Sequence, residues 1–375
     1  MYDYIVISRK NKDCAMRLLA RIGILFFAIA VAVSAASCTV ESAGDDRRAT
    51  LASQYVEEAG VSGLAVSVAL ANEIVWTQGF GFADIEQMVP VDPAATKFRV
   101  GSTAKPMTAM AVGMLYESGK LDLDEPIQTY LPEFPEKSGV ITTRMLAGHT
   151  AGIRHYKNGE FLSAVPYTSI TDALSIFSDD PILFQPGARF SYSTYGFNLI
   201  SAVLERAADQ EFLAFMSENV FGPTGMASTV ADHVVPIISN RSRYYTLADD
   251  RLVNAPWVDN SNKWAGGGLL STSEDLVRFG LAHLSDEFLS QQTIEMMWTS
   301  QITSDGQEAG YGIGWNIWTD EAGRRVIGHG GGSVGGITEL RIYPDQGLVI
   351  AIITNTSPAD LTPLTDSIVD VFLRH

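Results

Sequence analysis

The pattern of apolar and polar positions changes character along the chain. Residues 64–70 and 74–82 are apolar, partly β-branched runs separated by Ala71-Asn72-Glu73, and this spacing predicts an antiparallel hairpin. From Met107 to Leu115 the apolar residues instead recur at helical intervals, until the breaker Ser118-Gly119. The first part of the domain is therefore expected to pass from strands into a helix.

Strand patterns return near the end of the chain. Pro344-Asp345-Gln346-Gly347 has the composition of a turn and separates two apolar runs, which predicts a second pair of adjacent strands. Strands are expected at residues 313–318, 337–343 and 348–354, and a final helix at residues 364–373. Residues 120–305 carry helix and loop patterns, with helices expected at 173–177, 199–207, 212–219, 273–284 and 293–298.

These elements predict an α+β fold. The simplest arrangement joins the N- and C-terminal strands in one antiparallel sheet, which is flanked by helices and interrupted by an inserted, mostly helical lobe. We assign residues 50–100 and 309–375 to the sheet part and residues 101–308 to the helical part. With 375 residues, 46% of them hydrophobic, the chain is long enough for its core to divide in this way. A functional site is then expected between the two parts.

The chain begins with a segment that is typical of an export signal. Basic residues up to Arg21 precede an apolar run at 22–36, which at about 15 residues is shorter than the ~20 that span a bilayer as a helix. Residues 1–38 are therefore interpreted as a signal segment. The true start is either Met1 or Met16, because the segment that begins at Met16 is by itself a more typical signal peptide.

The end of this segment, Ala35-Ala36-Ser37-Cys38, resembles a bacterial lipobox, whose cysteine carries lipid. The sequence predicts lipidation at Cys38, and ordinary cleavage after a small residue is the alternative. Residues 39–49 are then a polar tether, and residues 50–375 are the domain. The protein is expected to be exported to the bacterial periplasm or cell envelope, with the lipid anchor as its only contact with the membrane.

The composition of the chain excludes several classes of partner and of functional site. The formal net charge is −17, and an acidic surface repels phosphate backbones, so no nucleic-acid partner is expected. The cysteines are Cys14 and Cys38, which excludes a disulfide framework, thiolate metal sites and a cysteine nucleophile from the domain. His149 and His155 match no common zinc spacing and are expected to be structural. The sequence predicts neither a metal nor a cofactor.

Ser102-Thr103-Ala104-Lys105 is the only S-x-x-K sequence in the chain. Pro106 lacks a backbone N–H and fits the first turn of a helix, so the helix must begin close to Ser102. A helix N-terminus favours a developing anion, and Lys105 lies on the same face of the helix as Ser102. A helix cap followed by a solvated lysine would give the same pattern, so the motif alone leaves both interpretations open.

Two further segments supply groups that serine chemistry needs. Phe190-Ser191-Tyr192-Ser193-Thr194-Tyr195-Gly196 follows a turn and offers Tyr192 as a second proton-transfer group. Lysine and tyrosine ionise near pH 10, so either needs a pKa shift of roughly 3 units, which desolvation in a cleft can supply. His329-Gly330-Gly331-Gly332 allows backbone N–H groups to approach a ligand, as an oxyanion hole requires. An ordinary aromatic residue and a structural glycine turn are the simpler alternatives.

Taken in order, these elements resemble the motifs of the serine beta-lactamase-like family, which includes class C beta-lactamases, D,D-peptidases, related esterases and a mitochondrial beta-lactamase-like serine protease. Ser102-x-x-Lys105 matches the nucleophile motif, residues 190–196 match the Tyr-x-Asn element, and His329-Gly330-Gly331 matches the Lys-Thr-Gly or His-x-Gly element. The resemblance runs from about residue 50 to the end of the chain. It implies a beta-lactamase/transpeptidase-like fold and an acyl-serine hydrolase that needs no metal or cofactor.

The resemblance also implies the roles of individual residues. Ser102 would be acylated while Lys105 and Tyr192 move its proton. The backbone N–H groups of Ser102 and Gly332 would form the oxyanion hole. The partner of this site would be a small-molecule or peptide substrate.

Thr194, His329 and Gly331 would contact that substrate. Two of these positions depart from the family pattern, because Thr194 replaces an asparagine and His329 replaces the lysine that is common in true lactamases. A neutral histidine offers no fixed charge to a carboxylate. Esters, small peptides or D-amino-acid-containing peptides are therefore expected as substrates, with weak or absent activity on beta-lactams.

Several alternatives remain. Tyr156-Lys157-Asn158 is a literal Tyr-x-Asn but lacks the sequence context of Tyr192, so Tyr192 is preferred. Gly331–Gly335 is a literal Gly-x-Ser-x-Gly, which offers Ser333 as an α/β-hydrolase nucleophile, although a strand follows it and that motif needs a helix. A non-catalytic penicillin-recognising sensor and a scaffold protein are the other functional alternatives. The sequence does not determine the oligomeric state.

Overall fold

A computed structural model describes residues 47–249 and 251–374. The predicted signal segment, the predicted lipidation site Cys38 and most of the predicted tether lie outside these residues. Within the described ranges, no helix is long and apolar enough to cross a membrane. Residues 47–59 are helical, and the unit described below begins at Leu51.

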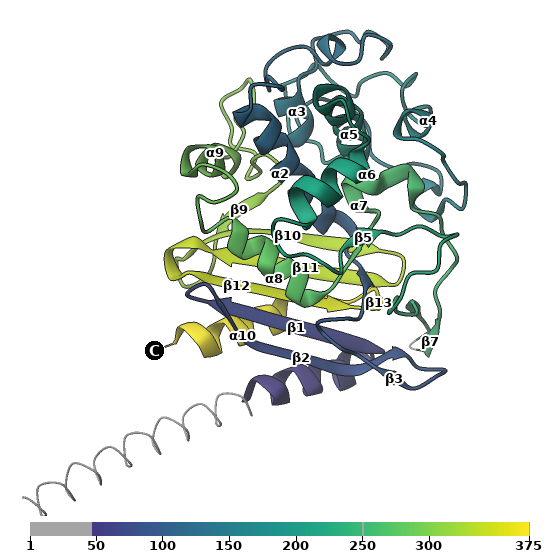
Figure 1. Cartoon of the computed structure of the whole chain (residues 1–375), viewed down its shortest axis with the longest axis vertical. Helices are drawn as coiled ribbons and strands as arrows, with labels where there is room; N and C mark the ends of the chain where they lie inside the picture. Colours follow the sequence, from purple (N-terminus) through teal and green to yellow (C-terminus); the bar gives the residue numbers. More distant parts are fainter. Residues whose placement is uncertain (1–46, 250, 375) are drawn as a thin grey trace, which may run out of the picture. The chain divides into compact units, whose positions relative to one another are not determined.

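A seven-stranded antiparallel sheet forms one layer of this unit (Figure 1). Its order is β3-β2-β1-β12-β11-β10-β9, so strands from both ends of the chain pair directly, and the predicted fold class is confirmed. The pairing of β1 with β12 runs from Leu64 opposite Thr354 to Leu70 opposite Leu348. The strands are β1 (Gly63–Leu70), β2 (Glu73–Asp84), β3 (Val89–Pro90), β9 (Asn316–Thr319), β10 (Arg325–Ser333), β11 (Gly336–Tyr343) and β12 (Leu348–Thr354).

The predicted hairpin near the start of the domain is β1-β2. Ala71 and Asn72 form its turn with φ angles of 51° and 70°. Two successive residues with positive φ are the mark of a type I′ turn, whose twist matches that of the strands it joins. The short polar break between the two apolar runs therefore fixes the register of this hairpin.

Side chains alternate between the two faces of the central strands, and each face has its own core. Ala65 and Ala351 belong to the core that includes helix α8 (Ser273–Ala282). Val66 and Ile350 belong to the opposite core, which includes the helical residues from 51 to 59 and helix α10 (Thr362–Leu373). Helix α8 lies within the range predicted as the helical lobe, but it covers the sheet (Figure 1).

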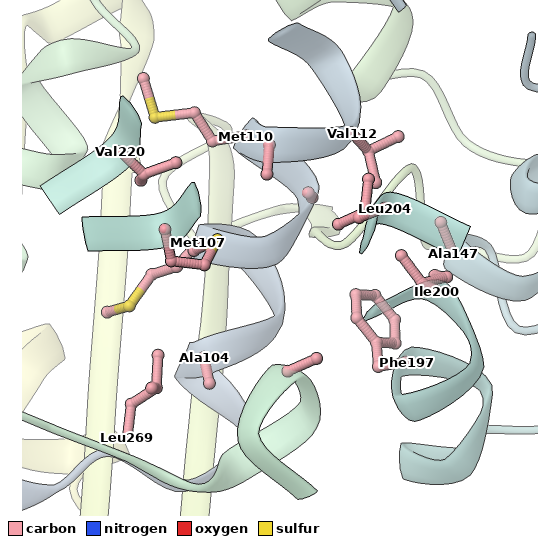
Figure 2. Packing of buried hydrophobic residues seen from close by; sticks show 14 of the residues in the cluster. Ala104, Met107, Met110, Val112, Ala147, Phe197, Ile200, Leu204, Val220 and Leu269 are labelled. Atoms are coloured by element: carbon pink, nitrogen blue, oxygen red, sulfur yellow. The ribbon is translucent and has the colours of Figure 1, made fainter. Parts of the chain in front are cut away.

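Helix α2 (Ala104–Glu117) is the centre of the helical part. Met107 and Met110 are fully buried, and Figure 2 shows the helix between Phe197 and Leu204 on one side and Val220 on the other. A helix that is buried nearly all round holds its N-terminus in a fixed place. The other helices are α3 (Thr143–Ala147), α4 (Ile170–Leu174), α5 (Thr194–Ala208), α6 (Phe212–Phe215), α7 (Trp264–Gly267) and α9 (Gln291–Met297).

Several elements were not predicted. The largest is β10, because its segment His329-Gly330-Gly331-Gly332 was expected to precede a strand and is itself part of one. Glycine is disfavoured in strands, but it allows another segment of backbone to approach closely. Two small sheets, of order β13-β6-β7 and β4-β8-β5, were also missed. Their strands are β4 (Phe98–Arg99), β5 (Val230–Ala231), β6 (Tyr245–Ala248), β7 (Arg251–Asn254), β8 (Leu269–Ser271) and β13 (Thr356–Ser357).

Candidate active site

Ser102 lies in a short 3-10 turn, η1 (Gly101–Thr103), which leads directly into α2. Gly101 adopts a φ of +53°, and a Cβ there would lie 2.7 Å from backbone atoms of Gly332. Only glycine therefore lets the turn approach strand β10 this closely. The Ser102 side chain is partly exposed, and its backbone N–H lies in the first turn, where N–H groups have no intrahelical partner.

Lys105 is fully buried directly behind Ser102. Its Nζ lies 3.0 Å from Oγ of Ser102, 3.2 Å from Oγ1 of Thr194 and 2.7 Å from the carbonyl oxygen of Gly266. None of the ion pairs among the described residues includes Lys105. Burial without a carboxylate partner disfavours the ammonium form, so the pKa of Lys105 lies well below its usual value, and the charge of Lys263 lowers it further.

Tyr192 is the third residue of the predicted catalytic set, and it lies two residues before the start of α5. Its ring centroid lies 4.8 Å from Nζ of Lys105. Burial raises the pKa of Tyr192, and a hydrogen bond with the Ser102 side chain opposes this rise. The structure thus brings together the three residues that were predicted to be catalytic, and the Tyr192 phenol is neutral at pH 7.

Two histidines hold the start of α5 in place. Nδ1 of His149 accepts the backbone N–H of Ser193 at 3.2 Å, and Nδ1 of His155 accepts that of Thr194 at 3.1 Å. Burial lowers the pKa of His155 to about 4 and that of His149 well below its usual value. Both rings are therefore neutral acceptors, and they position Tyr192, which lies next to this start.

Thr194 was expected to contact the substrate, and the structure corrects this expectation. Its side chain is buried, and its Oγ1 lies at Lys105. Its Cγ2 packs against Gly266, where an added Cβ would lie only 2.6 Å from it. Thr194, at the start of α5, therefore faces inward. The carbonyl oxygen of Gly266 lies 2.7 Å from Nζ of Lys105, a contact that the sequence did not predict, although the run Gly266-Gly267-Gly268 signals a close approach of backbone.

His329 lies beside the site, but its side chain is buried. Nδ1 lies 2.6 Å from the carbonyl oxygen of Gly330, which can only accept, so Nδ1 carries the proton. Nε2 then accepts the hydroxyl of Tyr311 at 2.9 Å. Burial lowers the pKa of His329 to about 3, so the ring is neutral at pH 7. Contact with a substrate would require Tyr311, whose contact with His329 the sequence did not predict, to move away.

Gly331, the third predicted contact residue, faces the protein interior. A Cβ at this position would lie 1.9 Å from the carbonyl oxygen of Val100, which precedes Ser102. The face of Gly331 is therefore covered by the η1 turn, and the expectation of direct substrate contact is corrected here too. What Gly331 provides is the close contact between β10 and the turn that carries Ser102.

The neighbouring Gly332, whose backbone is predicted to bind an oxyanion, is exposed. Strand β10 pairs with β9 only as far as Gly328, so β9 leaves the rest of that edge uncovered. A two-residue turn makes Ser333 and Gly336 a hydrogen-bonded pair of the β10-β11 hairpin. Because alternate residues of an antiparallel pair direct their N–H groups away from the partner strand, we infer that the Gly332 N–H points to the open edge.

Ser333, the alternative nucleophile, is buried in β10 and followed by a turn and strand β11. A nucleophile elbow needs a strand, a sharp turn and a helix, with the serine exposed. The local structure therefore excludes Ser333 as an α/β-hydrolase nucleophile. Within the described residues, no three His, Cys, Asp or Glu side chains are grouped so as to hold a metal ion.

Comparisons with known proteins agree with this geometry. The human mitochondrial serine beta-lactamase-like protein LACTB is 31% identical over 413 residues, which cover 81% of this chain and 75% of that protein. A D-amino acid amidase from Ochrobactrum anthropi SV3 shares the fold with a TM-score of 0.77 at 20% identity, over 88% of this chain and 99% of its own.

The hydrolase EstCE1, described as having promiscuous acyltransferase activity, shares the fold with a TM-score of 0.75 at 20% identity, over 88% of this chain and 98% of its own. The family described as Beta-lactamase matches residues 48–371, which include all three motifs around Ser102. With its fold, its motifs and this match in agreement, the chain belongs to the beta-lactamase family of serine acyl-hydrolases.

Proposed function

We propose that this protein hydrolyses small esters or peptides through an acyl-enzyme on Ser102, and that its activity on beta-lactams is weak or absent. The observation that supports this most is the environment of Lys105. Its amine is buried without a carboxylate and lies 3.0 Å from the Ser102 hydroxyl. Such an amine is a general base at neutral pH rather than a solvated charge.

The hydrogen bonds around Lys105 fit a neutral amine. A neutral amine has two N–H donors and one lone pair. The carbonyl of Gly266 can only accept, so it takes one N–H, and Oγ1 of Thr194 takes the second. The lone pair is then left for the third neighbour, the hydroxyl of Ser102. This is the arrangement in which Lys105 removes the proton of the nucleophile.

Acylation follows from these positions. Ser102 Oγ attacks the acyl carbon as its proton passes to Lys105, and the carbonyl oxygen becomes an oxyanion bound by the N–H groups of Ser102 and Gly332. Collapse of this intermediate breaks the bond to the leaving group, which takes the proton from Lys105 through Tyr192. Water then attacks the acyl-enzyme and gives a proton to Lys105, and this proton passes to Oγ of Ser102 as the acyl–Oγ bond breaks and the acid is released.

The expected substrate class rests on charge. In relatives, the lysine of the third motif offers a fixed positive charge to a carboxylate, whereas His329 is buried and neutral. The net charge of −17 adds a further, weaker bias against anionic substrates. Two structural relatives, described as a D-amino acid amidase and as a hydrolase with promiscuous acyltransferase activity, support amides and esters as the substrate class. Uncharged esters and small peptides are the class that fits this chain.

Covalent labelling and turnover together test the proposal. A fluorophosphonate probe, followed by mass spectrometry, should modify Ser102. Ser102→Ala should abolish both labelling and hydrolysis of p-nitrophenyl acetate without unfolding the protein, since the lost hydroxyl costs ~0.5–2 kcal/mol. Ser333→Ala is the matched control and should retain activity. The value of kcat/KM should be higher for the ester than for a chromogenic cephalosporin at pH 7, and an equal or higher cephalosporin value contradicts the substrate assignment.

The cellular location rests on different residues from the activity. We propose that the protein is exported and anchored through lipid on Cys38, on the basis of the signal segment alone. Stable anchoring requires two acyl signals or more, as a lipidated N-terminal cysteine provides.

A further inference from the structure

Residues 154–160, which include the literal Tyr-x-Asn sequence, lie against the start of α5, directly after Tyr192. The hydroxyl of Ser193 donates to the carbonyl oxygen of Arg154 at 2.7 Å. The same hydroxyl oxygen accepts the backbone N–H of Gly196 at 3.0 Å, which makes Ser193 the N-cap of α5. The cap residue next to Tyr192 is thus tied to the backbone of residue 154.

The next two residues of α5 are bound by the same segment. The backbone N–H of Thr194 donates to Nδ1 of His155 at 3.1 Å. The hydroxyl of Tyr195, whose ring is fully buried, donates to Oε2 of Glu160 at 3.0 Å. Each of the three residues that follow the tyrosine of the site therefore makes one hydrogen bond to residues 154–160.

The guanidinium of Arg154 holds this segment in shape. It donates two N–H groups to the carboxylate of Glu160, at 2.7 and 3.0 Å. It donates one each to the carbonyl oxygens of His155 and Ile176, at 2.9 and 2.8 Å, and its Nε–H donates to the carboxylate of Asp180. An arginine has five N–H donors, and all five are used here. A lysine cannot reproduce this planar fork, so the arrangement is specific to arginine.

The position of Tyr192 depends on these contacts. Tyr192 precedes the N-cap and lies outside the helix, so it is held by what holds the residues after it. Its ring centroid lies 4.8 Å from Nζ of Lys105, and Oγ1 of Thr194 lies 3.2 Å from the same amine. A displacement of the start of α5 would move both groups relative to Lys105.

The ion pair between Arg154 and Glu160 is suited to set a position rather than to add stability. The two side chains are 9% and 22% exposed, and the cost of removing such charges from water offsets much of their attraction. An exposed pair shows the contrast. Arg206, on α5, donates one hydrogen bond of 2.7 Å to Glu133, with side chains 58% and 47% exposed.

We propose that Arg154 and Glu160 are positioning residues, which act through the first residues of α5 to hold Tyr192 at the leaving group and Thr194 at Lys105. This inference rests on the proposed function, in which Tyr192 passes a proton to the leaving group. A displaced Tyr192 should therefore matter most for leaving groups that need a proton. Ethoxide needs one, whereas p-nitrophenolate is stable enough to leave without it.

The test compares kcat/KM for ethyl acetate and p-nitrophenyl acetate, which transfer the same acetyl group to Ser102. This parameter covers the steps up to the acyl-enzyme, so a shared deacylation step does not mask the difference. Arg154→Lys should lower the value for ethyl acetate about tenfold more than that for p-nitrophenyl acetate, which is part of what a well-placed general acid contributes. An equal fall for both esters, as in a protein that is merely less folded, overturns the proposal.

A second variant covers the case in which Arg154→Lys does not fold. Tyr195→Phe removes only the hydroxyl that donates to Glu160, and it should change the same ratio by about threefold, since one hydrogen bond is lost. An unchanged ratio in Tyr195→Phe then overturns the proposal. Arg206→Lys and Tyr116→Phe make the same replacements at exposed positions and should leave both kcat/KM values unchanged.

A readout without turnover separates this inference from the proposed function. Fluorine NMR of the protein labelled with fluorotyrosine follows Tyr192, whose resonance is assigned through Tyr192→Phe. Arg154→Lys should shift that resonance, and Arg206→Lys should not. A shift supports the inference even if the wild type hydrolyses neither ester, an outcome that would contradict only the proposed function. An unmoved resonance in a folded Arg154→Lys protein overturns the inference.

Discussion

Gly331→Ala is the substitution that most directly tests how strand β10 and the nucleophile are coupled. The new Cβ would lie 1.9 Å from the carbonyl oxygen of Val100 and 2.9 Å from Oγ1 of Thr103. Close carbon–oxygen contacts in proteins are about 3.3–3.6 Å, so strand and turn must separate by roughly 1.4 Å. Both atoms belong to the segment that carries Ser102, so the oxyanion hole must widen.

The size of the effect follows from this displacement. A misplacement of about 1 Å at reacting groups costs on the order of 100-fold in rate, so kcat/KM for a p-nitrophenyl ester should fall by about that factor. Overpacking should also lower the free energy of unfolding by ~1–3 kcal/mol, with a fall in Tm of about 2–4 °C for each kcal/mol. Steady-state kinetics and calorimetry measure the two effects separately.

The control lies one residue away in the same strand. A Cβ on Gly330 would have Oε2 of Glu339 as its nearest neighbour at 3.2 Å, the end of a flexible side chain. Gly330→Ala should therefore keep nearly full activity. If Gly331→Ala and Gly330→Ala have the same kcat/KM as the wild type, the close contact between β10 and the η1 turn does not position the nucleophile, and the reasoning is refuted.

Three further predictions concern pH, packing and export. The neutral form of His155 accepts the N–H of Thr194, and its folded pKa of about 4 lies below the unfolded value of ~6.5, so stability is complete above pH ~6.5 and is lost as pH falls towards 4. His155→Gln keeps an acceptor that does not titrate, and a Tm series should show a flatter acid limb than the wild type. Met107→Ala leaves a cavity in the core of α2 and should lower the free energy of unfolding by ~2–5 kcal/mol in denaturant titrations, while Met88→Ala at an exposed site should not. The mature chain should begin at a lipid-blocked Cys38, and a free N-terminus after that residue in a soluble extracytoplasmic fraction would contradict the lipoprotein hypothesis.

The sequence by itself determined the elements whose patterns are local. The hairpin around Ala71 and Asn72 follows from two apolar runs and a short polar break, and the structure confirms it. The start of α2 close to Ser102 follows from Pro106, since proline fits only the first turn, and this places Lys105 behind the serine. These inferences needed only neighbours within a few residues, where backbone sterics and hydrogen-bonding rules decide.

Tertiary structure alone decided which side chains surround the base. Glycines have low strand propensity, so β10 depends on its pairing with β9 and β11 and on the packing of the η1 turn on Gly331. Thr194 is buried at the start of α5 with its hydroxyl at Lys105, and no local pattern in the sequence sets which way that side chain faces. Gly266 reaches Lys105 across more than a hundred residues of chain, from a segment whose sequence shows only glycines and a turn. Contacts between distant segments are fixed by how the whole core packs, and for that reason the serine and its lysine were readable from the sequence while the groups that tune the lysine were not.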